Sequence, residues 1–491
     1  MKVKEAFFLA LLTAGAFLVR GYHPYMDDAA FYVPAVKKAI DPTLYPRSAE
    51  FFESHARLTL FPNLVARIAR LLHLPLDYVL LLLQAACMFL FVFACWKLGC
   101  VCFELPEARW CAAAVVAATL TVPVAGTALF LFDSCLNPRC FSAFTAVFAV
   151  AAALGRRYAV AAAWLAGAAL IHPLMPVYGA FFILLLVWNR TRENGQAVVA
   201  GTPAPSMAPA VLAPQRISFD PPTEAYHQAA LRHDFHYVVK WEWYEWIGIF
   251  APVALFLWFY RIARSRRLEN VALLCRTLVP YVLLSFAAAL VLDIPARFEA
   301  LARFQPMRSL YLAYVVMFVL VGGMLGQFVL KRSVGRWLLL FVPLCAGLSA
   351  YQAYSFPATP YYEWPWSANP NQWVQAFNWI RQNTPRDAYF ALDPLHMELP
   401  GEDVHGFRAI AERGMLADIV KDSGAVSMFP GLAGAWWEQV SAQKDWRKFQ
   451  AADFTRLRSS YGVDWAVLQQ PGVAGMSCPY ENAAVRVCRV N

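Results

Sequence analysis

The stretch MKVKEAFFLALLTAGAFLVRGYHPYMDDAAFY, residues 1–32, decides the fold, because it places an apolar segment directly before a polar loop that carries two adjacent acids. Its basic start and short apolar run resemble a secretory signal peptide, but no small-residue cleavage pattern follows. Arg20 closes the apolar run immediately before the polar loop. We therefore expect an uncleaved first membrane span over about residues 6–20, with Lys2 and Lys4 holding its start in the cytoplasm.

The composition of the whole chain is that of a membrane protein. Of its 491 residues, 59% are hydrophobic and only 15% are charged, which is more apolar than a soluble globular domain. The formal net charge is +9, and basic residues cluster beside apolar segments at Arg156-Arg157, Arg261 through Arg267 and Lys331 through Arg336. Such clusters are typical of cytoplasmic loops between spans. The charge therefore needs no nucleic-acid partner, and the lipid bilayer is the expected one.

With these clusters in the cytoplasm, the apolar segments thread through the membrane about nine times. The expected crossings cover about residues 6–20, 76–98, 110–126, 140–154, 159–170, 246–260, 271–291, 309–330 and 337–355. A further apolar segment, residues 176–188, is shorter than the roughly 20 residues of a full span. A crossing there would also move the later arginine clusters to the wrong side. We expect this segment to be re-entrant or interfacial, with a tenth crossing as the alternative.

The expected fold class is a mainly α polytopic membrane protein with a small C-terminal α/β domain outside the cytoplasm. The membrane bundle covers residues 1–355, and the extracytoplasmic domain covers residues 356–491. The bundle carries an acidic first outer loop, residues 21–75, and a Pro/Ala-rich outer loop, residues 189–245. Within the second loop, residues 195–215 show neither a helical nor a strand period.

The C-terminal residues mix helical and strand patterns. Residues 371–384 predict a helix, and residues 387–393 and 463–469 predict short strands. Cys478 and Cys488 bracket a terminal hairpin and could form a disulfide in an oxidising compartment. Cys135 and Cys140 flank an outer turn and could pair in the same way.

Asp27 and Asp28 are the first candidates for chemistry. A carboxylate that follows a membrane helix is often only solvated, or it caps the next helix, which here would begin at Ala29. These two acids, however, share a long outer loop with His23, Tyr32 and Arg57 beside a membrane-embedded bundle. Apolar surroundings raise the pKa of a carboxyl group and let it act as a general base.

In outline the chain resembles the GT-C class of integral-membrane glycosyltransferases, which includes protein O-mannosyltransferases, lipid A aminoarabinose transferases and oligosaccharyltransferases. The class combines many spans, an acidic first outer loop and often a soluble outer C-terminal domain. DDAAFY, residues 27–32, matches the acidic motif. WIRQNTPRDAYFALDP, FRAIAERG and YGVDWAVLQ, at residues 379–394, 407–414 and 461–469, are similar to the outer domains. The chain has no WWDYG-like oligosaccharyltransferase signature, despite Trp436-Trp437.

The resemblance implies that a sugar moves from a polyprenyl-phosphate donor to the hydroxyl of a lipid, glycan or protein acceptor at the outer membrane face. Asp27 or Asp28 would accept the proton of that hydroxyl. It also implies a bacterial inner-membrane location with the C-terminal domain on the periplasmic side. No cofactor is certain: a divalent cation held by the two aspartates stays open, because no third ligand is identifiable.

Three arginines at the expected outer boundary are candidates for binding the donor phosphate: Arg308, Arg139 and Arg303. Arginine suits phosphate through paired hydrogen bonds, but a boundary arginine can also extend toward water without any function. Arg308 is the foremost candidate, because it opens directly into an apolar span.

His172, His23 and Arg57 are the remaining candidates for a substrate site. His172 lies in IHPLMP, residues 171–176, which predicts a helix break near the outer face. The alternative for His172 is a buried histidine bonded to a backbone carbonyl that the break leaves free.

Two other functions stay open. A transporter or flippase also carries ionisable residues within a bundle, but often with internal repeats or paired broken helices. We find one broken segment, at His172-Pro173, and no persuasive repeat. A catalytically inactive relative of the transferases is the other alternative, because a fold does not guarantee activity.

Overall fold

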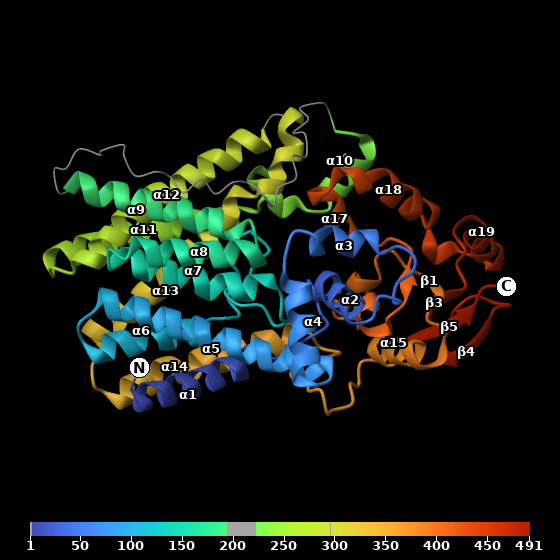
Figure 1. The fold of residues 1–491 in the computed structure, drawn as a ribbon, viewed down its shortest axis with the longest axis horizontal. Helices are drawn as coiled ribbons and strands as arrows, with labels where there is room; N and C mark the ends of the chain where they lie inside the picture. Colours follow the sequence, from blue (N-terminus) through green and yellow to red (C-terminus); the bar gives the residue numbers. More distant parts are fainter. Residues whose placement is uncertain (1, 194–221, 295) are drawn as a thin grey trace.

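The computed structural model describes residues 2–193, 222–294 and 296–491. It contains a bundle of long helices at one end and a mixed β-sheet with short helices at the other (Figure 1). The predicted fold class, a mainly α membrane bundle with a C-terminal α/β part, is confirmed. Residues 195–215 of the predicted Pro/Ala-rich loop lie outside the described residues.

The bundle consists of long helices that lie side by side (Figure 1). Their bounds are α1 (Val3–Arg20), α5 (Leu76–Cys102), α6 (Pro106–Ala118), α7 (Pro138–Leu154), α8 (Tyr158–Ile171), α9 (Met175–Glu193), α11 (Trp243–Ser265), α12 (Glu269–Asp293), α13 (Leu310–Met324) and α14 (Val334–Ser355). Within the described ranges, five helical stretches are long and apolar enough to cross a membrane: α5, α11, α12, Leu301–Leu330 and α14. These lengths and compositions make the chain an integral membrane protein.

The polar first loop folds into three short helices, α2 (Ala29–Ile40), α3 (Glu50–Ala56) and α4 (Phe61–Leu72). They lie between the bundle and the C-terminal elements (Figure 1). Helix α2 packs against α3 and α4 and also contacts α16 (Phe407–Ala411). The loop is therefore the structural link between the two ends of the molecule.

The C-terminal part is built on a five-stranded sheet with the order β2-β1-β3-β5-β4. Strand β1 pairs in parallel with β2 and β3, whereas β5 pairs antiparallel with β3 and β4. The strands are β1 (Tyr389–Leu392), β2 (Gly414–Met415), β3 (Trp465–Gln469), β4 (Ser477–Glu481) and β5 (Val485–Arg489), and the helices besides α16 are α15 (Gln372–Asn383), α17 (Asp422–Met428), α18 (Ala433–Ala442) and α19 (Ala451–Tyr461). Helix α15 and strands β1 and β3 confirm the predicted helix and strands.

The two predicted cysteine pairs differ in outcome. Cys478 and Cys488 form a disulfide that links β4 to β5, as the hairpin pattern predicts. Cys135 and Cys140 are buried free thiols, so a disulfide between them is wrong for this structure. Cys140 lies in the first turn of α7, and its Sγ lies 3.5 Å from the backbone oxygen of Cys135 instead of meeting its sulfur.

Residues 176–188, which the sequence predicts to be re-entrant or interfacial, form a regular helix. They belong to the continuous 19-residue helix α9, which is roughly 28 Å long at about 1.5 Å per residue. Helix α9 packs against α7, α8 and α12, and Arg190 near its end donates hydrogen bonds to the last carbonyls of α7. The described chain resumes at α10 (Glu224–Leu231), which packs on α17 and α18 at the opposite end.

The basic clusters gather at one end of the bundle. Arg332, before α14, pairs with Glu107 at the start of α6, with 2.5 Å between Nε and the carboxylate oxygen. The guanidinium of Arg266, after α11, lies 5.6 Å from the ring centre of Phe328. These contacts join turns that are far apart in the sequence, as expected if they all lie on one side of the membrane.

A buried carboxylate ties the first outer loop to the C-terminal part. The Glu363 carboxylate lies 3.1 Å from His23 Nδ1 and 3.0 Å from His405 Nε2, and all three side chains are buried. Burial lowers the pKa of His405, but the charges and hydrogen bonds of Glu363 and Glu402 together raise it by more, to about 9. Burial also raises the pKa of the neighbouring Glu402 to about 8.

These shifts predict a loss of stability in alkaline solution. A raised folded-state pKa of His405 stabilises the fold fully below the unfolded value near 6.5, and that stabilisation is lost as pH rises through 9. Glu402 acts in the same direction, because folding disfavours its ionised form. We expect the thermal midpoint of the purified protein to fall between pH 6.5 and 9, and His405→Gln to flatten this fall. An equally steep fall in the variant would contradict the assignment.

Candidate active site

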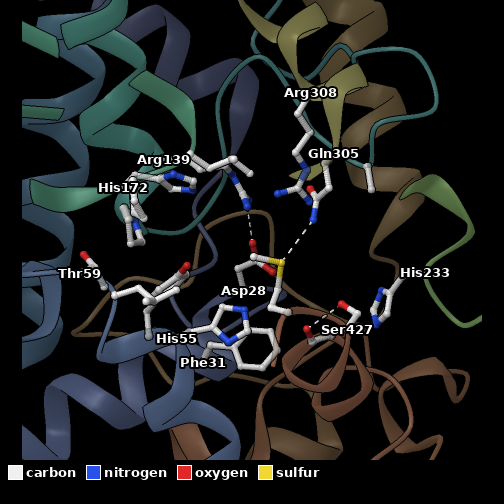
Figure 2. Close-up of a pocket in the computed structure, with 18 of the residues that line it drawn as sticks. Asp28, Phe31, His55, Thr59, Arg139, His172, His233, Gln305, Arg308 and Ser427 are labelled. Carbon is white, nitrogen blue, oxygen red and sulfur yellow. Dashed lines mark hydrogen bonds and ion pairs between the residues drawn. The ribbon is translucent and has the colours of Figure 1, made fainter. Parts of the chain in front are cut away.

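A cavity of about 190 Å³ lies where the bundle, the first outer loop and the C-terminal part meet. Its polar lining residues include Asp27, Asp28, His55, Thr59, Arg139, His172, His233, Gln305, Arg308 and Lys421. Figure 2 shows Arg139 and Arg308 extending toward Asp28 from the bundle, with His55 and Phe31 on the opposite wall. The cavity therefore brings together carboxylates and cations from three separate parts of the chain.

Asp28 occupies the N-cap position of α2, but its side chain makes no capping hydrogen bond. One carboxylate oxygen accepts from the Arg139 guanidinium at 2.5 Å, and the other lies 3.2 Å from the Lys421 ammonium. The side chain is about one-fifth exposed. Helix capping therefore does not account for this acid, whose two oxygens both serve ion pairs.

Asp27 is held in an uncommon backbone conformation. Its φ is +54°, in the left-handed region that aspartate tolerates better than most side chains. Its backbone N–H donates to the carbonyl of Val404 at 2.9 Å, so the C-terminal part fixes this turn. The carboxylate pairs with Lys421 and is 49% exposed. Asp27 is therefore the more accessible of the two acids.

Arg139 enters the cavity from the first turn of α7. Asn137 caps this helix, and its side-chain oxygen accepts from the backbone N–H of Arg139 at 2.9 Å. Asp133 accepts from Arg139 Nε at 3.1 Å and from Asn137 Nδ2 at 2.8 Å. The guanidinium is thus held between two carboxylates, those of Asp28 and Asp133. Sequence reasoning missed Asp133, although FDSCLNPRC places it beside the predicted arginine.

Lys421 comes from the C-terminal part, at the N-cap position of α17. The next residue, Asp422, forms two 2.8 Å hydrogen bonds with Arg408 of α16, which fixes the start of α17. Sequence reasoning missed Lys421, because 394 positions separate it from Asp27 and no motif surrounds it. Only the tertiary fold identifies it as part of the site.

Arg308 lies on the 3₁₀ turn Pro306–Ser309, just before α13. The Tyr178 hydroxyl holds the preceding backbone by donating to the Phe304 and Gln305 carbonyls at 2.6 and 2.9 Å. Within the described chain, the Arg308 guanidinium forms no hydrogen bond or ion pair, and its Nε is buried without a partner. Gln305 Oε1, also on the cavity wall, is buried without a partner as well. Such buried polar atoms indicate that the cavity is built to receive a polar ligand.

The cations of the site shift the pKa of Asp28 in the direction opposite to the expected one. Burial alone would raise the pKa of Asp28, but Arg139 and Lys421 together lower it well below its usual range. The expectation that apolar surroundings raise this pKa is therefore wrong for Asp28. Burial lowers the pKa of His55 to about 4 and that of His233 to about 3, so both are neutral at pH 7. These histidines offer hydrogen bonds to a ligand and no charge.

Of the remaining sequence-predicted residues, one lines the cavity and three lie outside it. His172 follows the last residue of α8, so the helix breaks there as predicted, and its side chain lines the cavity. His23 lies outside the cavity in the buried pair with Glu363. Arg57 pairs with Glu53 at the surface and is 78% exposed. Arg303 contacts the backbone of Met428 and does not line the cavity.

The aspartates do not fit a divalent cation in this arrangement. No group of three or more His, Cys, Asp or Glu residues suited to holding a metal occurs within the described ranges. Asp27 and Asp28 are also already paired with Lys421, and Asp28 with Arg139. A cation would have to displace these positive groups.

Comparisons with known proteins give structural likenesses alone. No family model and no curated protein matches the chain. Three solved structures of the Archaeoglobus fulgidus oligosaccharyltransferase are similar to it: one tethered to an acceptor peptide containing the NVT sequon, one of AglB with an inhibitory peptide and dolichol-phosphate, and one with Zn and sulfate. Their identities are 14, 14 and 15%, and their TM-scores are 0.44, 0.43 and 0.42. The matches cover 95, 94 and 94% of this chain and 69, 69 and 67% of the others.

The ion pairs of Arg139 predict a stability effect. Arg139→Gln leaves two largely buried carboxylates without their guanidinium, and the free energy of unfolding should fall by about 3 kcal/mol. Reversible unfolding in mixed micelles measures the change. Arg57→Gln is the matched control, because an exposed pair contributes little, and it should unfold like the unsubstituted protein. Equal stability of the Arg139 variant would show that the ion pairs do not hold the site together.

Proposed function

We propose that the protein is a membrane glycosyltransferase that moves a sugar from a polyprenyl-phosphate donor to an acceptor hydroxyl at the outer membrane face. The observation that carries this proposal is the unpaired guanidinium of Arg308, which faces two carboxylates in a cavity at the end of an apolar bundle. The donor has one anionic phosphate and a long apolar chain. The cavity offers cations for the phosphate, and the adjoining helices offer an apolar surface for the chain.

The charge distribution leaves one cation for the donor. Asp28 and Asp133 share Arg139, while Asp27 and Asp28 share Lys421. Arg308 has no carboxylate partner among the described residues and is free to bind a phosphate through two parallel hydrogen bonds. A phosphate bound there would also lie near Arg139, because both guanidinium groups extend toward Asp28 (Figure 2).

The reaction increases the negative charge on the phosphate. The acceptor oxygen forms a bond to the anomeric carbon while the bond from that carbon to the phosphate oxygen breaks. The donor phosphodiester, with one negative charge, leaves as a phosphate monoester with two, and the hydroxyl proton passes to a carboxylate. Cations fixed around the leaving oxygen stabilise the transition state more than the bound donor. Arg308 and Arg139 are the groups that would do this.

We assign Asp27 as the base that takes the proton of the acceptor hydroxyl. Asp28 has a strongly lowered pKa and holds two cations, so it is a weak base and a positioning group. Asp27 is more exposed and has one cationic partner, Lys421.

Substitutions at these residues test the proposal. Surface glycans and membrane glycolipids are compared between cells with and without the gene, and the glycan lost on deletion then reports activity. At equal expression, Arg308→Gln should lower its formation by about 100-fold through lost charge stabilisation. Asp27→Asn should lower it by at least about 100-fold through the lost base. Arg332→Gln, at the far end of the same helices, should leave it unchanged.

Two results would contradict the proposal. Full activity of both Asp27→Asn and Asp28→Asn would place the base elsewhere. An unchanged set of glycans and glycolipids after deletion of the gene would favour the inactive relative or the transporter.

A further inference from the structure

A second cavity, of about 530 Å³, lies on the other side of the first outer loop from the candidate active site. Pro24 and Tyr25 line this second cavity, whereas Asp27 and Asp28 line the first. Its other walls come from the start of α5, from the segment before α15 and from α15 itself. No residue of this cavity takes part in the proposed transfer.

One face of α15 provides the polar wall. Gln375, Asn378, Arg381 and Gln382 all line the cavity, at the spacing of a single helical face. The opposite face, which includes Trp373, Phe377 and Ile380, is buried in the core of the C-terminal part. The helix is thus amphipathic, and its polar side faces a hollow that could accommodate a ligand.

Two amides on this wall have no partner in the protein. The side chains of Asn378 and Gln382 are one helical turn apart, and neither forms a hydrogen bond with a described residue. Each amide offers both donors and an acceptor. Their spacing suits a ligand that presents donor and acceptor groups side by side.

Aromatic rings form the other walls. Trp379 and Tyr480 stack with ring centres 5.1 Å apart and an interplanar angle of 30°. Trp364 stacks on Trp366 at 5.3 Å with an angle of 4°. Trp379, Tyr480 and Trp364 line the cavity together with Tyr25. These rings place aromatic surface beside the unpartnered amides.

We propose that this second cavity is a saccharide-binding site, with the amides of Asn378 and Gln382 bonding sugar hydroxyls and the aromatic rings covering the apolar faces of the sugar rings. A saccharide is the ligand class that combines paired donors and acceptors with flat C–H faces. A lipid chain would leave the amides unpaired, at a cost in free energy. A peptide could pair the amides, but β-augmentation needs a free strand edge, and the cavity lining includes one strand residue, Tyr480. The site is defined without reference to the proposed transfer activity.

Binding is tested with the full-length protein in lipid nanodiscs, labelled on the scaffold protein and applied to an array of neutral and acidic oligosaccharides. Nanodiscs avoid sugar-based detergents, which would compete. We expect capture of at least one oligosaccharide and a weakening by about fivefold for Asn378→Ala and for Gln382→Ala, because each loses one ligand hydrogen bond. Both positions face the cavity and not the core, so the variants should fold. Trp437→Ala, an aromatic change on α18 outside the cavity, is the control and should bind normally.

A second binding experiment determines whether the saccharide is a free oligosaccharide or the headgroup of a glycolipid. The captured oligosaccharide is offered free in solution and as the headgroup of a lipid in the nanodisc, and tighter binding of the lipid form would identify a glycolipid ligand. Absence of capture by every oligosaccharide would overturn the proposal, as would equal capture by the Asn378→Ala/Gln382→Ala double variant. Binding that persists in an Arg308→Gln variant without transfer activity would separate this site from the proposed function.

Discussion

The carboxylate of Asp28 joins two cations that reach it from opposite parts of the molecule. Arg139 comes from a bundle helix and Lys421 from the C-terminal part, and Asp28 itself lies on the loop between them. A largely buried carboxylate is stable only where cations or hydrogen bonds replace the lost water. The cavity can therefore form only when all three parts of the chain are docked, and its shape depends on that docking.

The need to pair these buried carboxylates also determines which cation remains available to bind a ligand. Three carboxylates around the cavity, those of Asp27, Asp28 and Asp133, are shared between Arg139 and Lys421. Arg308 stands opposite them, on a turn that the Tyr178 hydroxyl holds in place. A site arranged in this way has fixed anions and one unengaged cation before any ligand enters. The donor that we propose, a sugar phosphodiester, would bring a single negative charge to this cation and gain a second during the reaction.

The sequence predicted the parts of the fold that depend on local pattern. Apolar segments indicated the long helices, and short continuous apolar runs indicated β1 and β3. His172-Pro173 indicated the break after α8. Residues 176–188 alone are shorter than a full span, whereas the structure extends them into the 19-residue helix α9.

The site was predictable only in part, for a physical reason. Asp27, Asp28, Arg139, Arg308 and His172 stand out because charged or titratable groups are rare beside apolar spans. No such pattern marks Lys421 and Asp133 in the sequence. The pattern does mark His23, Arg57 and Arg303, but these three residues form their contacts outside the cavity. Even the pKa of Asp28 was misjudged, because its direction depends on two cations that only tertiary structure places beside it.

The most direct test of this account is an experimental structure of the protein in nanodiscs with polyprenyl phosphate added. The account predicts a phosphate within hydrogen-bonding distance of the Arg308 guanidinium, inside the cavity beside Asp27 and Asp28, with its apolar chain leaving along the bundle. A phosphate bound elsewhere, with Arg308 still without a partner, would contradict it.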